Sequence, residues 1–316
     1  MGKVLSECSG EFPTLRTKFP SVWPDSPIPS RKRIDSMDVI TKIHALLNTV
    51  GVPAILEDPD ALATMSDDHR DMLHEARDLA STAVEEKPED EQLIDLLYMS
   101  HMTLSTSQYL YSVLAADEPA AVPSPAELNK TWAGRPLVKY DKNALKDMLV
   151  PTTTLDTLTQ VGLPDEAEPY LSFEPVLKRL AEAEELDGED EDYDRYFQAY
   201  WLLGYTEDDD ALCIDERADG VVALLQRDWG FFAMQYVNAS VGHLVQTMQA
   251  YDDMLKSVDP QAIAESFPNI QVPDEARIAF LARVSAFDPG AMAEGAFWYE
   301  ELSLLEQGGG EDQDQE

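Results

Sequence analysis

Cysteine and positive charge are both scarce in this sequence. The two cysteines, Cys8 and Cys213, are too few and too far apart to build a disulfide framework. No apolar run approaches the roughly 20 residues of a membrane-spanning helix, and the N-terminus lacks the apolar stretch of a secretory signal. We therefore expect a cytoplasmic protein with neither a membrane span nor a disulfide-stapled fold.

Basic residues are outnumbered by acidic ones, with 23 Lys and Arg against 61 Asp and Glu and a formal net charge of -38. A field of this sign repels nucleic acid and anionic membranes, and it attracts a basic protein partner. A halophilic source and a general gain in solubility are alternative explanations. The first 35 residues carry six basic and four acidic side chains, and this uneven distribution favours a local function over a general adaptation.

Motifs for catalysis, metal binding and cofactor binding are also absent. None of the five histidines pairs with another at metal-binding helix spacing beside a glutamate. No nucleophile elbow, phosphate-binding glycine loop or Cys-x-x-Cys pair occurs. The acidic run 187–192 has its glycine in second place, whereas a calcium-binding EF-hand loop needs it in sixth place. We therefore predict a protein that is not an enzyme and that has no cofactor and no metal site.

The N-terminal part is predicted to contain a leader, a helical bundle and a linker. Residues 1–35 are rich in proline, serine and basic side chains, which is typical of irregular structure. Gly2 lies in a formal N-myristoylation pattern, so membrane association through a lipid on Gly2 is one hypothesis and a chance match is the other. Apolar residues at helical spacing over 36–116 predict a small all-α bundle. The proline-rich stretch 117–134 predicts a linker.

The C-terminal half mixes strand and helix patterns. Short apolar runs that follow one another without helices between them predict an antiparallel meander. The strand candidates are Tyr170–Phe173, Tyr200–Leu203, Ala211–Ile214, Val221–Gln226 and Phe231–Val237. Helices are expected at 152–160, after Asn238-Ala239-Ser240, at 274–286 and at 290–306. Residues 307–316 form a predicted disordered acidic tail.

A series of short motifs in this half carries a family resemblance. In chain order they are Gly162-Leu163-Pro164, Leu203-Gly204-Tyr205, Leu212-Cys213-Ile214-Asp215, Asp219-Gly220-Val221-Val222, Tyr236-Val237-Asn238-Ala239-Ser240 and Ala286-Phe287-Asp288-Pro289, followed by Trp298. Their order and spacing resemble the SUKH superfamily, in its fourth immunity group, over about residues 135–306. The resemblance implies an α+β fold, with a bent antiparallel sheet flanked by helices, that follows the all-α helical bundle.

The resemblance also implies binding without catalysis. Bacterial members of the family commonly bind and neutralise a cognate toxin, often one that attacks nucleic acid. Related eukaryotic domains act as intracellular regulatory or scaffold modules, which is the alternative. The matching positions are interpreted as structural, and they are Gly162, Gly204, Asp215, Gly220, Asn238, Ser240 and Asp288. Gly220 fits a turn with positive φ, and Asn238 or Ser240 fits a helix cap.

Two acidic clusters in the same half are candidates for the partner-binding surface. The residues that we expect to face a partner are Glu189, Asp190, Glu191, Asp192, Tyr193, Asp194, Phe197, Glu207, Asp208, Asp209 and Asp210. Their loops border the same strands of a meander, so an acidic edge can fill the basic cleft of a nucleic-acid-directed toxin as a phosphate mimic. Interleaved aromatic side chains supply anchors. The alternative is a solvated acidic loop beside ordinary core aromatics.

Overall fold

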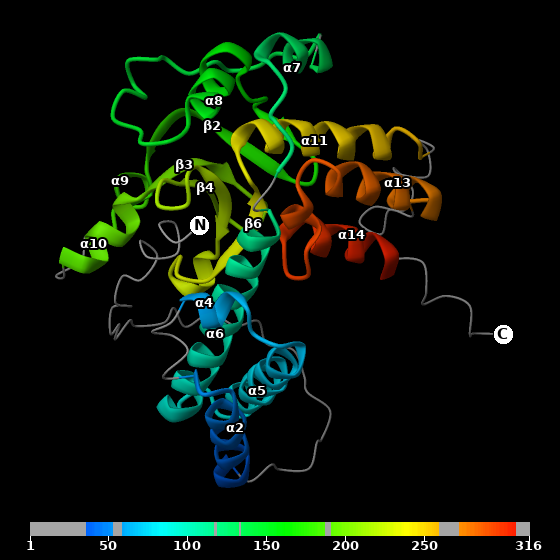
Figure 1. Ribbon diagram of the computed structural model, residues 1–316. Coiled ribbons are helices and arrows are strands. Elements are labelled where there is room, and N and C mark those ends of the chain that lie inside the picture. Colours follow the sequence, from blue (N-terminus) through cyan, green and yellow to red (C-terminus); the bar gives the residue numbers. More distant parts are fainter. Residues whose placement is uncertain are drawn as a thin grey trace.

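Figure 1 shows the computed structural model of the protein, which describes residues 36–52, 59–116, 119–132, 134–186, 191–258 and 272–307. Several sequence predictions lie outside these residues. They are the leader 1–35 with its lipidation site Gly2, the acids Glu189 and Asp190, and the tail from residue 308 onward.

The described residues form one curled, six-stranded antiparallel sheet with helices around it. The strands are β1 (Glu166–Ala167), β2 (Leu171–Arg179), β3 (Tyr200–Tyr205), β4 (Ala211–Asp215), β5 (Val221–Leu225) and β6 (Met234–Asn238). Their order in the sheet is their order in the chain, which is the meander that the sequence predicts. The predicted α+β class and the bent antiparallel sheet are confirmed.

Helices precede, interrupt and follow the strands. Those before the sheet are α2 (Ser36–Val50), α4 (Pro59–Ala63), α5 (Asp67–Glu86), α6 (Glu91–Ala115), α7 (Pro125–Thr131), α8 (Thr152–Asp156) and the π-helix η1 (Thr157–Val161). Between strands lie α9 (Leu180–Ala183), α10 (Glu191–Gln198) and the 3-10 turn η2 (Arg227–Trp229). After the sheet come α11 (Val241–Leu255), α13 (Asp274–Ser285), the 3-10 turn η3 (Pro289–Met292) and α14 (Phe297–Gln307).

Bulges curl the sheet. The β2–β3 register shifts between Phe173 and Lys178, and the β3–β4 register shifts between Leu202 and Gly204. A bulge bends the strand that carries it and increases the local twist. A Cβ atom at position 204 would lie 1.9 Å from the carbonyl oxygen of Ser172. Glycine at this position therefore allows β2 and β3 to approach where the sheet turns.

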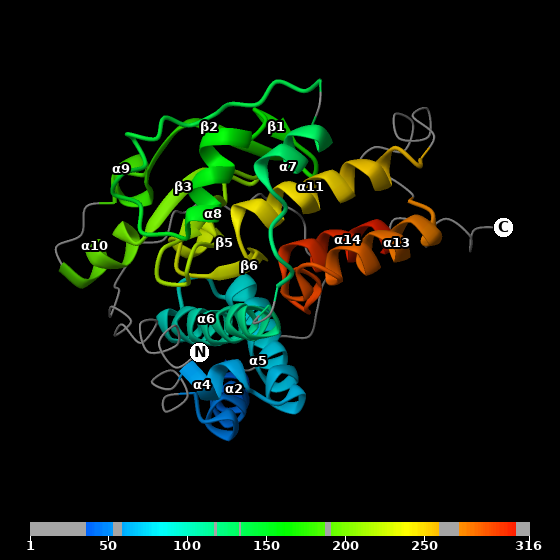
Figure 2. The ribbon, with the colours of Figure 1, turned by 45° about the horizontal axis from the view of Figure 1, so that its top comes forward.

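Helices lie on both sides of the sheet. Helix α6 lies below the strands in Figures 1 and 2, while α8 lies above them in Figure 1 and in front of them in Figure 2. Helix α11 packs against β5 and β6. Every residue of β4 and of β5 is buried. This double coverage explains why the two strands are continuous apolar runs in the sequence and do not alternate with polar residues.

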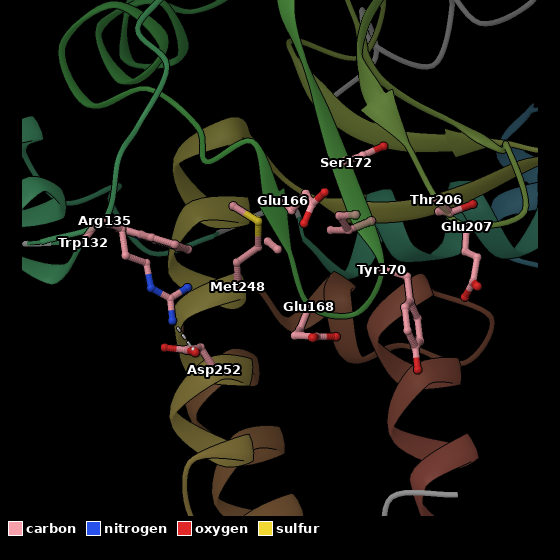
Figure 3. Close-up of a pocket in the computed structure, with 12 residues that line it drawn as sticks. Trp132, Arg135, Glu166, Glu168, Tyr170, Ser172, Thr206, Glu207, Met248 and Asp252 are labelled. Atoms are coloured by element: carbon pink, nitrogen blue, oxygen red, sulfur yellow. Dashed lines mark hydrogen bonds and ion pairs between the residues drawn. The ribbon is translucent and has the colours of Figure 1, made fainter. Parts of the chain in front are cut away.

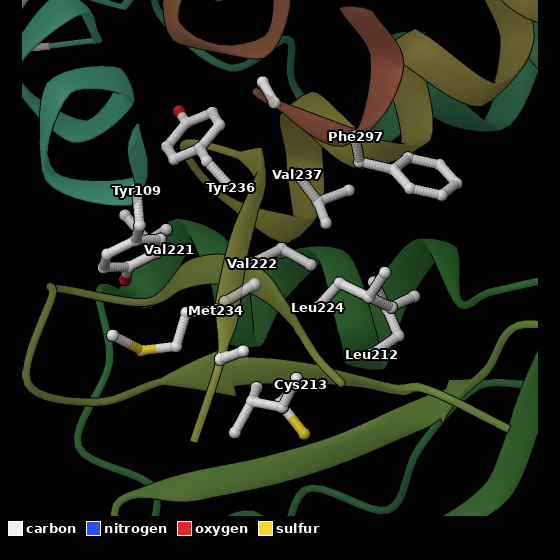
Figure 4. Packing of buried hydrophobic residues seen from close by; sticks show 14 of the residues in the cluster. Tyr109, Leu212, Cys213, Val221, Val222, Leu224, Met234, Tyr236, Val237 and Phe297 are labelled. Atoms are coloured by element: carbon white, nitrogen blue, oxygen red, sulfur yellow. The ribbon is translucent and has the colours of Figure 1, made fainter. Parts of the chain in front are cut away.

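Helix α6 fastens the N-terminal helices to the sheet. The Ser105 hydroxyl donates to the carbonyl oxygen of Met234 at 2.6 Å and accepts from the Met234 N–H at 2.7 Å. One turn later the Tyr109 hydroxyl donates to Asp215 Oδ2 at 3.5 Å. Figure 4 shows Tyr109 beside Val221 and Met234 in the buried cluster. The helical region predicted over 36–116 is confirmed, and its status as a separate domain stays a prediction.

A buried carboxylate ties β6 to the C-terminal helices. Asp288 is fully buried and accepts three hydrogen bonds, each 2.9 Å long, from the Tyr236 hydroxyl, the Asn238 amide group and the Ala239 N–H. The Trp298 indole N–H donates to Asn238 Oδ1 at 2.9 Å. Because all of these buried polar groups have partners, the network fixes the C-terminal helices against β6 without an unpaired group.

Candidate partner-binding surface

The first acidic cluster leads into helix α10. Glu191, Asp192, Tyr193 and Asp194 lie in the first half of α10, where the structure describes the backbone but not the side chains. Acidic residues in a first helical turn favour the helix because they face the positive end of its dipole. The charge pattern predicts an acidic loop here, so the helix is a difference between prediction and structure.

Phe197, near the end of α10, is fully buried. Its ring centroid lies 4.9 Å from that of Tyr196 and 5.1 Å from that of Phe232. Phe197 therefore anchors α10 on the sheet domain. Because its side chain is buried, it cannot contact a partner directly and affects binding only through the position of the helix. Tyr196 also stacks on Phe232. These aromatic residues are close together in the sequence, but their packing against Phe232 depends on the fold.

The second cluster begins in the loop between β3 and β4. Glu207, Asp208 and Asp209 are exposed, and no hydrogen bond or ion pair of their carboxylates occurs within the described part of the chain. The loop is tight, because the Asp209 N–H donates to the Thr206 carbonyl at 3.1 Å. We call the side chains of Glu207, Asp208 and Asp209 the loop acids.

Asp210 differs from the loop acids because it turns inward. Its Oδ1 accepts the backbone N–H of Arg227 at 2.7 Å. Burial raises the pKa of Asp210 to about 6, with the neighbouring carboxylates of Asp208 and Asp228 acting in the same direction. Asp210 thus closes the loop from inside and is a weaker candidate for partner contact.

Arg227 links Glu184, which follows α9, to the loop between β3 and β4. Its guanidinium donates to Glu184 Oε1 at 2.9 Å and to the carbonyl oxygen of Asp209 at 3.1 Å. The Tyr205 hydroxyl donates to the same Glu184 oxygen at 2.5 Å. The structure therefore places Glu184 beside the loop acids at one end of the sheet.

The acids that follow β4 are used within the fold. Asp215 is 1% exposed and accepts from Arg217 Nε at 3.1 Å and from the Arg217 N–H at 2.9 Å. Glu216 accepts from Arg179 at 2.6 Å, from the Trp201 indole at 2.8 Å and from the Leu149 N–H at 2.7 Å. These carboxylates are already satisfied, so they offer little to a partner.

A groove of about 600 Å³ opens beside the loop acids. Its walls are the β1–β2 hairpin, the start of the β3–β4 loop, helix α11 and the segment that follows α7, as Figure 3 shows. Glu166, Glu168, Tyr170 and Glu207 line it. Sequence reasoning missed this groove because its residues come from four stretches that lie far apart in the chain.

A comparison with family models shows to which family the chain belongs. A family model described as SUKH-4 immunity protein matches residues 123–307. The chain belongs to the SUKH-4 immunity protein family. The match contains the whole sheet and the helices α7 to α14, whereas α2 to α6 precede it. No curated protein and no solved structure matches the chain.

Within the SUKH-4 region, the positions singled out as structural lie at turns and in buried networks. Gly162 ends the π-helix with φ +87°, and Gly220 closes the β4–β5 turn with φ +84°. The Gly220 N–H donates to the Asp215 carbonyl at 2.9 Å, and glycine is favoured there because its φ is positive. Ser240 caps α11, where its hydroxyl accepts from the His243 N–H.

The Ser240–His243 contact and Cys213, both in the SUKH-4 region, are buried. The Ser240 hydroxyl lies 2.9 Å from His243 Nδ1, and His243 Nε2 donates to the Ala120 carbonyl at 2.8 Å. This resembles a serine–histidine pair, but Ser240 is 8% exposed and His243 3% exposed. Cys213 is fully buried, and burial raises the pKa of its thiol well above the ordinary value.

No described helix is long and apolar enough to cross a membrane. No group of three or more His, Cys, Asp or Glu side chains in the described part of the chain could hold a metal ion.

Proposed function

We propose that this SUKH-4 family protein binds a cognate toxin in the cytoplasm and neutralises it by contact, without catalysis. One observation carries the proposal: the loop acids Glu207, Asp208 and Asp209 are exposed and their carboxylates form no hydrogen bond or ion pair with the residues that the structure describes, while the acids after β4 are satisfied inside the fold. Family membership supports an immunity role, and the loop acids supply a surface for it.

The proposed toxin partner carries a basic, nucleic-acid-binding cleft. Three adjacent carboxylates at the end of a rigid sheet produce a local negative potential, which attracts a cleft built to hold phosphates. Such complementarity speeds association and selects against partners of the wrong sign. Covering the cleft with the loop acids would exclude nucleic acid from it, which is the proposed mechanism of neutralisation.

Helix α10 extends this proposed surface. Glu191, Asp192, Tyr193 and Asp194 lie on a helix that Phe197 anchors to the domain. An anchored helix presents its side chains at a lower cost in conformational entropy than a free loop would. In the proposal, the loop acids give the first contact, and the start of α10 adds to it.

The absence of catalysis is part of the proposal. The side chains of Ser240, His243 and Cys213 could form nucleophile arrangements, and all three are buried. A nucleophile must reach its substrate to act. The enclosed positions therefore support a binding role over an enzymatic one.

The test is charge reversal in the loop. Asp208→Lys with Asp209→Lys changes the net charge by four units, and Glu85→Lys with Glu86→Lys at the exposed end of α5 makes the same change elsewhere. We expect the loop variant to bind a toxin domain encoded beside this protein's gene roughly a hundredfold more weakly. The affinity of that variant should also depend less on salt. If the α5 variant loses as much affinity as the loop variant, only the overall charge matters and the proposed surface is wrong.

A second variant addresses the first cluster. Reversing Glu189, Asp190, Glu191 and Asp192 to lysine should weaken toxin binding further and lower the salt dependence. Unchanged affinity together with an unchanged salt dependence would restrict the proposed surface to the loop acids.

A further inference from the structure

Helix α13 is apolar on two sides. Its inner side packs against α11 and η3, with Phe280 and Val284 buried there and the Phe280 ring centroid 5.7 Å from that of Tyr251 in α11. Its outer side carries Ile278, which is 66% exposed, and Leu281, which is 41% exposed. A helix that is apolar all round is normally buried all round, so the outer side of α13 is suited to a further contact.

The outer side of α13 combines large and small side chains. Ala279 and Ala282 are exposed beside Ile278 and Leu281, and residues three or four apart are neighbours on one side of a helix. We call these four residues the α13 face. The two alanines let another backbone approach closely, and the two large side chains fit best opposite small ones. The α13 face therefore contains both halves of a matching pattern.

The charges of α13 also form a pattern that can match itself. The helix has two acids and two bases and is neutral, whereas the whole chain has a net charge of -38. Its acids, Asp274 and Glu275, lie in the first turn, and Arg283 lies in the last turn. Two copies of so acidic a chain approach each other most easily where the surface is locally neutral. The α13 face is such a surface, and its two ends have opposite charge.

An antiparallel pair of α13 helices satisfies the size pattern. A two-fold axis level with Phe280 places Ile278 opposite Ala282 of the second copy. The same axis places Leu281 opposite Ala279 of the second copy. Each large side chain then meets a small one, and the symmetry forms every contact twice.

The same arrangement pairs the charged ends. Glu275 and Arg283 lie on one flank of α13, and equivalent flanks meet in an antiparallel pair, so each Glu275 comes within reach of Arg283 of the other copy. Glu275 has no ion-pair partner among the described residues. Arg283 donates to Asp253 at 2.7 Å, but its side chain is 46% exposed and has donors for a second carboxylate.

Other occupants match the α13 face less well. A basic partner is attracted by exposed acids and not by a neutral helix. Residues 259–271 precede α13 in the chain and lie outside the described residues, and they contain two acids and no base. They could pair with Arg283 but not with Glu275, whereas a second copy of the chain pairs with both.

We propose that the α13 face is a self-association surface through which two copies of this chain form an antiparallel, two-fold symmetric dimer. One pair of helices buries less than the roughly 1,200–2,000 Å² of a stable complex, so the dimer is weak and forms at concentrations on the order of 10–100 µM. This inference goes beyond the proposed function, because neither the loop acids nor a toxin takes part in the dimer.

The test is sedimentation velocity of the full chain over a range of concentrations. From about 1 µM to about 500 µM, the weight-average mass should rise toward twice that of the monomer, which is 35.3 kDa. Raising the salt concentration should strengthen the dimer, because salt screens the repulsion between two acidic molecules. A monomer over the whole range at both low and high salt overturns the proposal.

A matched pair of variants locates the surface. Ile278→Glu with Leu281→Glu should weaken dimerisation at least about tenfold, because two apolar side chains lose their burial. Leu149→Glu with Val176→Glu places the same two charges at exposed apolar residues elsewhere and should leave the dimer nearly unchanged. Equal weakening in the two double variants overturns the proposal.

A charge swap tests the antiparallel arrangement. Glu275→Arg alone and Arg283→Glu alone each bring like charges together across the two-fold axis and should weaken the dimer about threefold. The variant with both substitutions has the net charge of the unchanged chain and should recover its affinity. Without that recovery, the antiparallel pairing is wrong.

Urea titration at a concentration where the chain is monomeric distinguishes the other occupant. If the α13 face is open in the monomer, Ile278→Glu with Leu281→Glu should leave the urea midpoint nearly unchanged, since both side chains are exposed. A clear fall in the midpoint, together with a chain that stays monomeric at high concentration, shows that the chain covers this face itself and overturns the proposal.

Discussion

The two ends of strand β4 carry similar acidic sequences but use them in opposite ways. Before the strand, Glu207, Asp208 and Asp209 are exposed, and their carboxylates have no ion-pair partner among the described residues. After it, Asp215 and Glu216 are held by arginines at 3.1 Å and 2.6 Å. The comparison shows that the density of acids along the chain does not reveal their role. What separates the two ends is whether an arginine side chain reaches the carboxylate.

The largest expected effect comes from a substitution at the buried end of β4. Asp215→Ala leaves the Arg217 guanidinium beside Tyr200 and Tyr196 without its carboxylate, and removing one partner of a buried pair costs roughly 3–5 kcal/mol. We expect the free energy of unfolding to fall by about 3 kcal/mol in urea titrations. Asp208→Ala, the matched change at the exposed end, should alter it by less than about 0.5 kcal/mol. Similar losses in the two variants would contradict the distinction between the two ends.

A smaller effect is expected from a change that keeps the shape of the side chain. Glu216→Gln removes the charge that pairs with Arg179 but leaves an oxygen for the Trp201 indole. The loss of one part-buried, charge-assisted hydrogen bond should cost about 1–2 kcal/mol. Thermal unfolding followed by tryptophan fluorescence measures it. Glu207→Gln serves as the control and should unfold at the same temperature as the unchanged protein.

The smallest expected effect concerns the pH dependence of stability that Asp210 contributes within the loop. Burial raises the pKa of Asp210 to about 6, with Asp208 and Asp228 adding to the rise and Arg227 opposing it. A carboxyl with a raised pKa in the folded state binds protons more tightly there, so its contribution to stability is present at low pH. That contribution is lost as the pH rises from about 4 to about 6.

Asp210→Asn should therefore stabilise the protein above pH 6 by at most about 1 kcal/mol, since solvent screens this group, and should have no effect near pH 4. Asparagine keeps the oxygen that accepts the Arg227 N–H. Urea titrations at pH 4.5 and pH 8 measure the difference, with Glu85→Gln as control. A stabilisation of the same size at both pH values would show that the carboxylate's charge is not the cause.

The sequence predicts the central strands well because their signal is local. Strands β3, β4 and β5 are apolar runs bounded by turn residues, and each lies within about two residues of its predicted limits. The last strand starts later than predicted, at Met234 and not at Phe231. Phe231 has φ +65°, which no strand residue adopts, so the apolar run continues where the strand does not.

Short elements that depend on their neighbours were harder to predict. Strand β1 has two residues, and it exists because Glu166 and Ala167 pair with β2. Helix α7 lies within the stretch predicted as a linker, although Ser124 and Glu127 form a capping box there with proline in the first turn. That local signal was present in the sequence and was outweighed by the proline content of the stretch.

The candidate surface could be predicted from the sequence only in part. The sequence located both acidic clusters, but it did not separate the loop acids from Asp215 and Glu216. That separation depends on Arg179 and Arg217, and Arg179 lies 37 residues from Glu216 in the chain. The burial of Phe197 against Phe232 is likewise a result of tertiary packing.

The contact between Ser105 and Met234 has a consequence for solubility. Strand β6 is the last in the sheet, and an uncovered outer strand is where a second molecule can add a strand of its own and begin aggregation. The Ser105 hydroxyl takes both the N–H and the carbonyl of Met234, so α6 occupies hydrogen-bonding positions that a foreign strand would need. Helix α6 precedes the residues that match the family, so in this chain a segment outside the family match occupies the edge of the sheet at Met234.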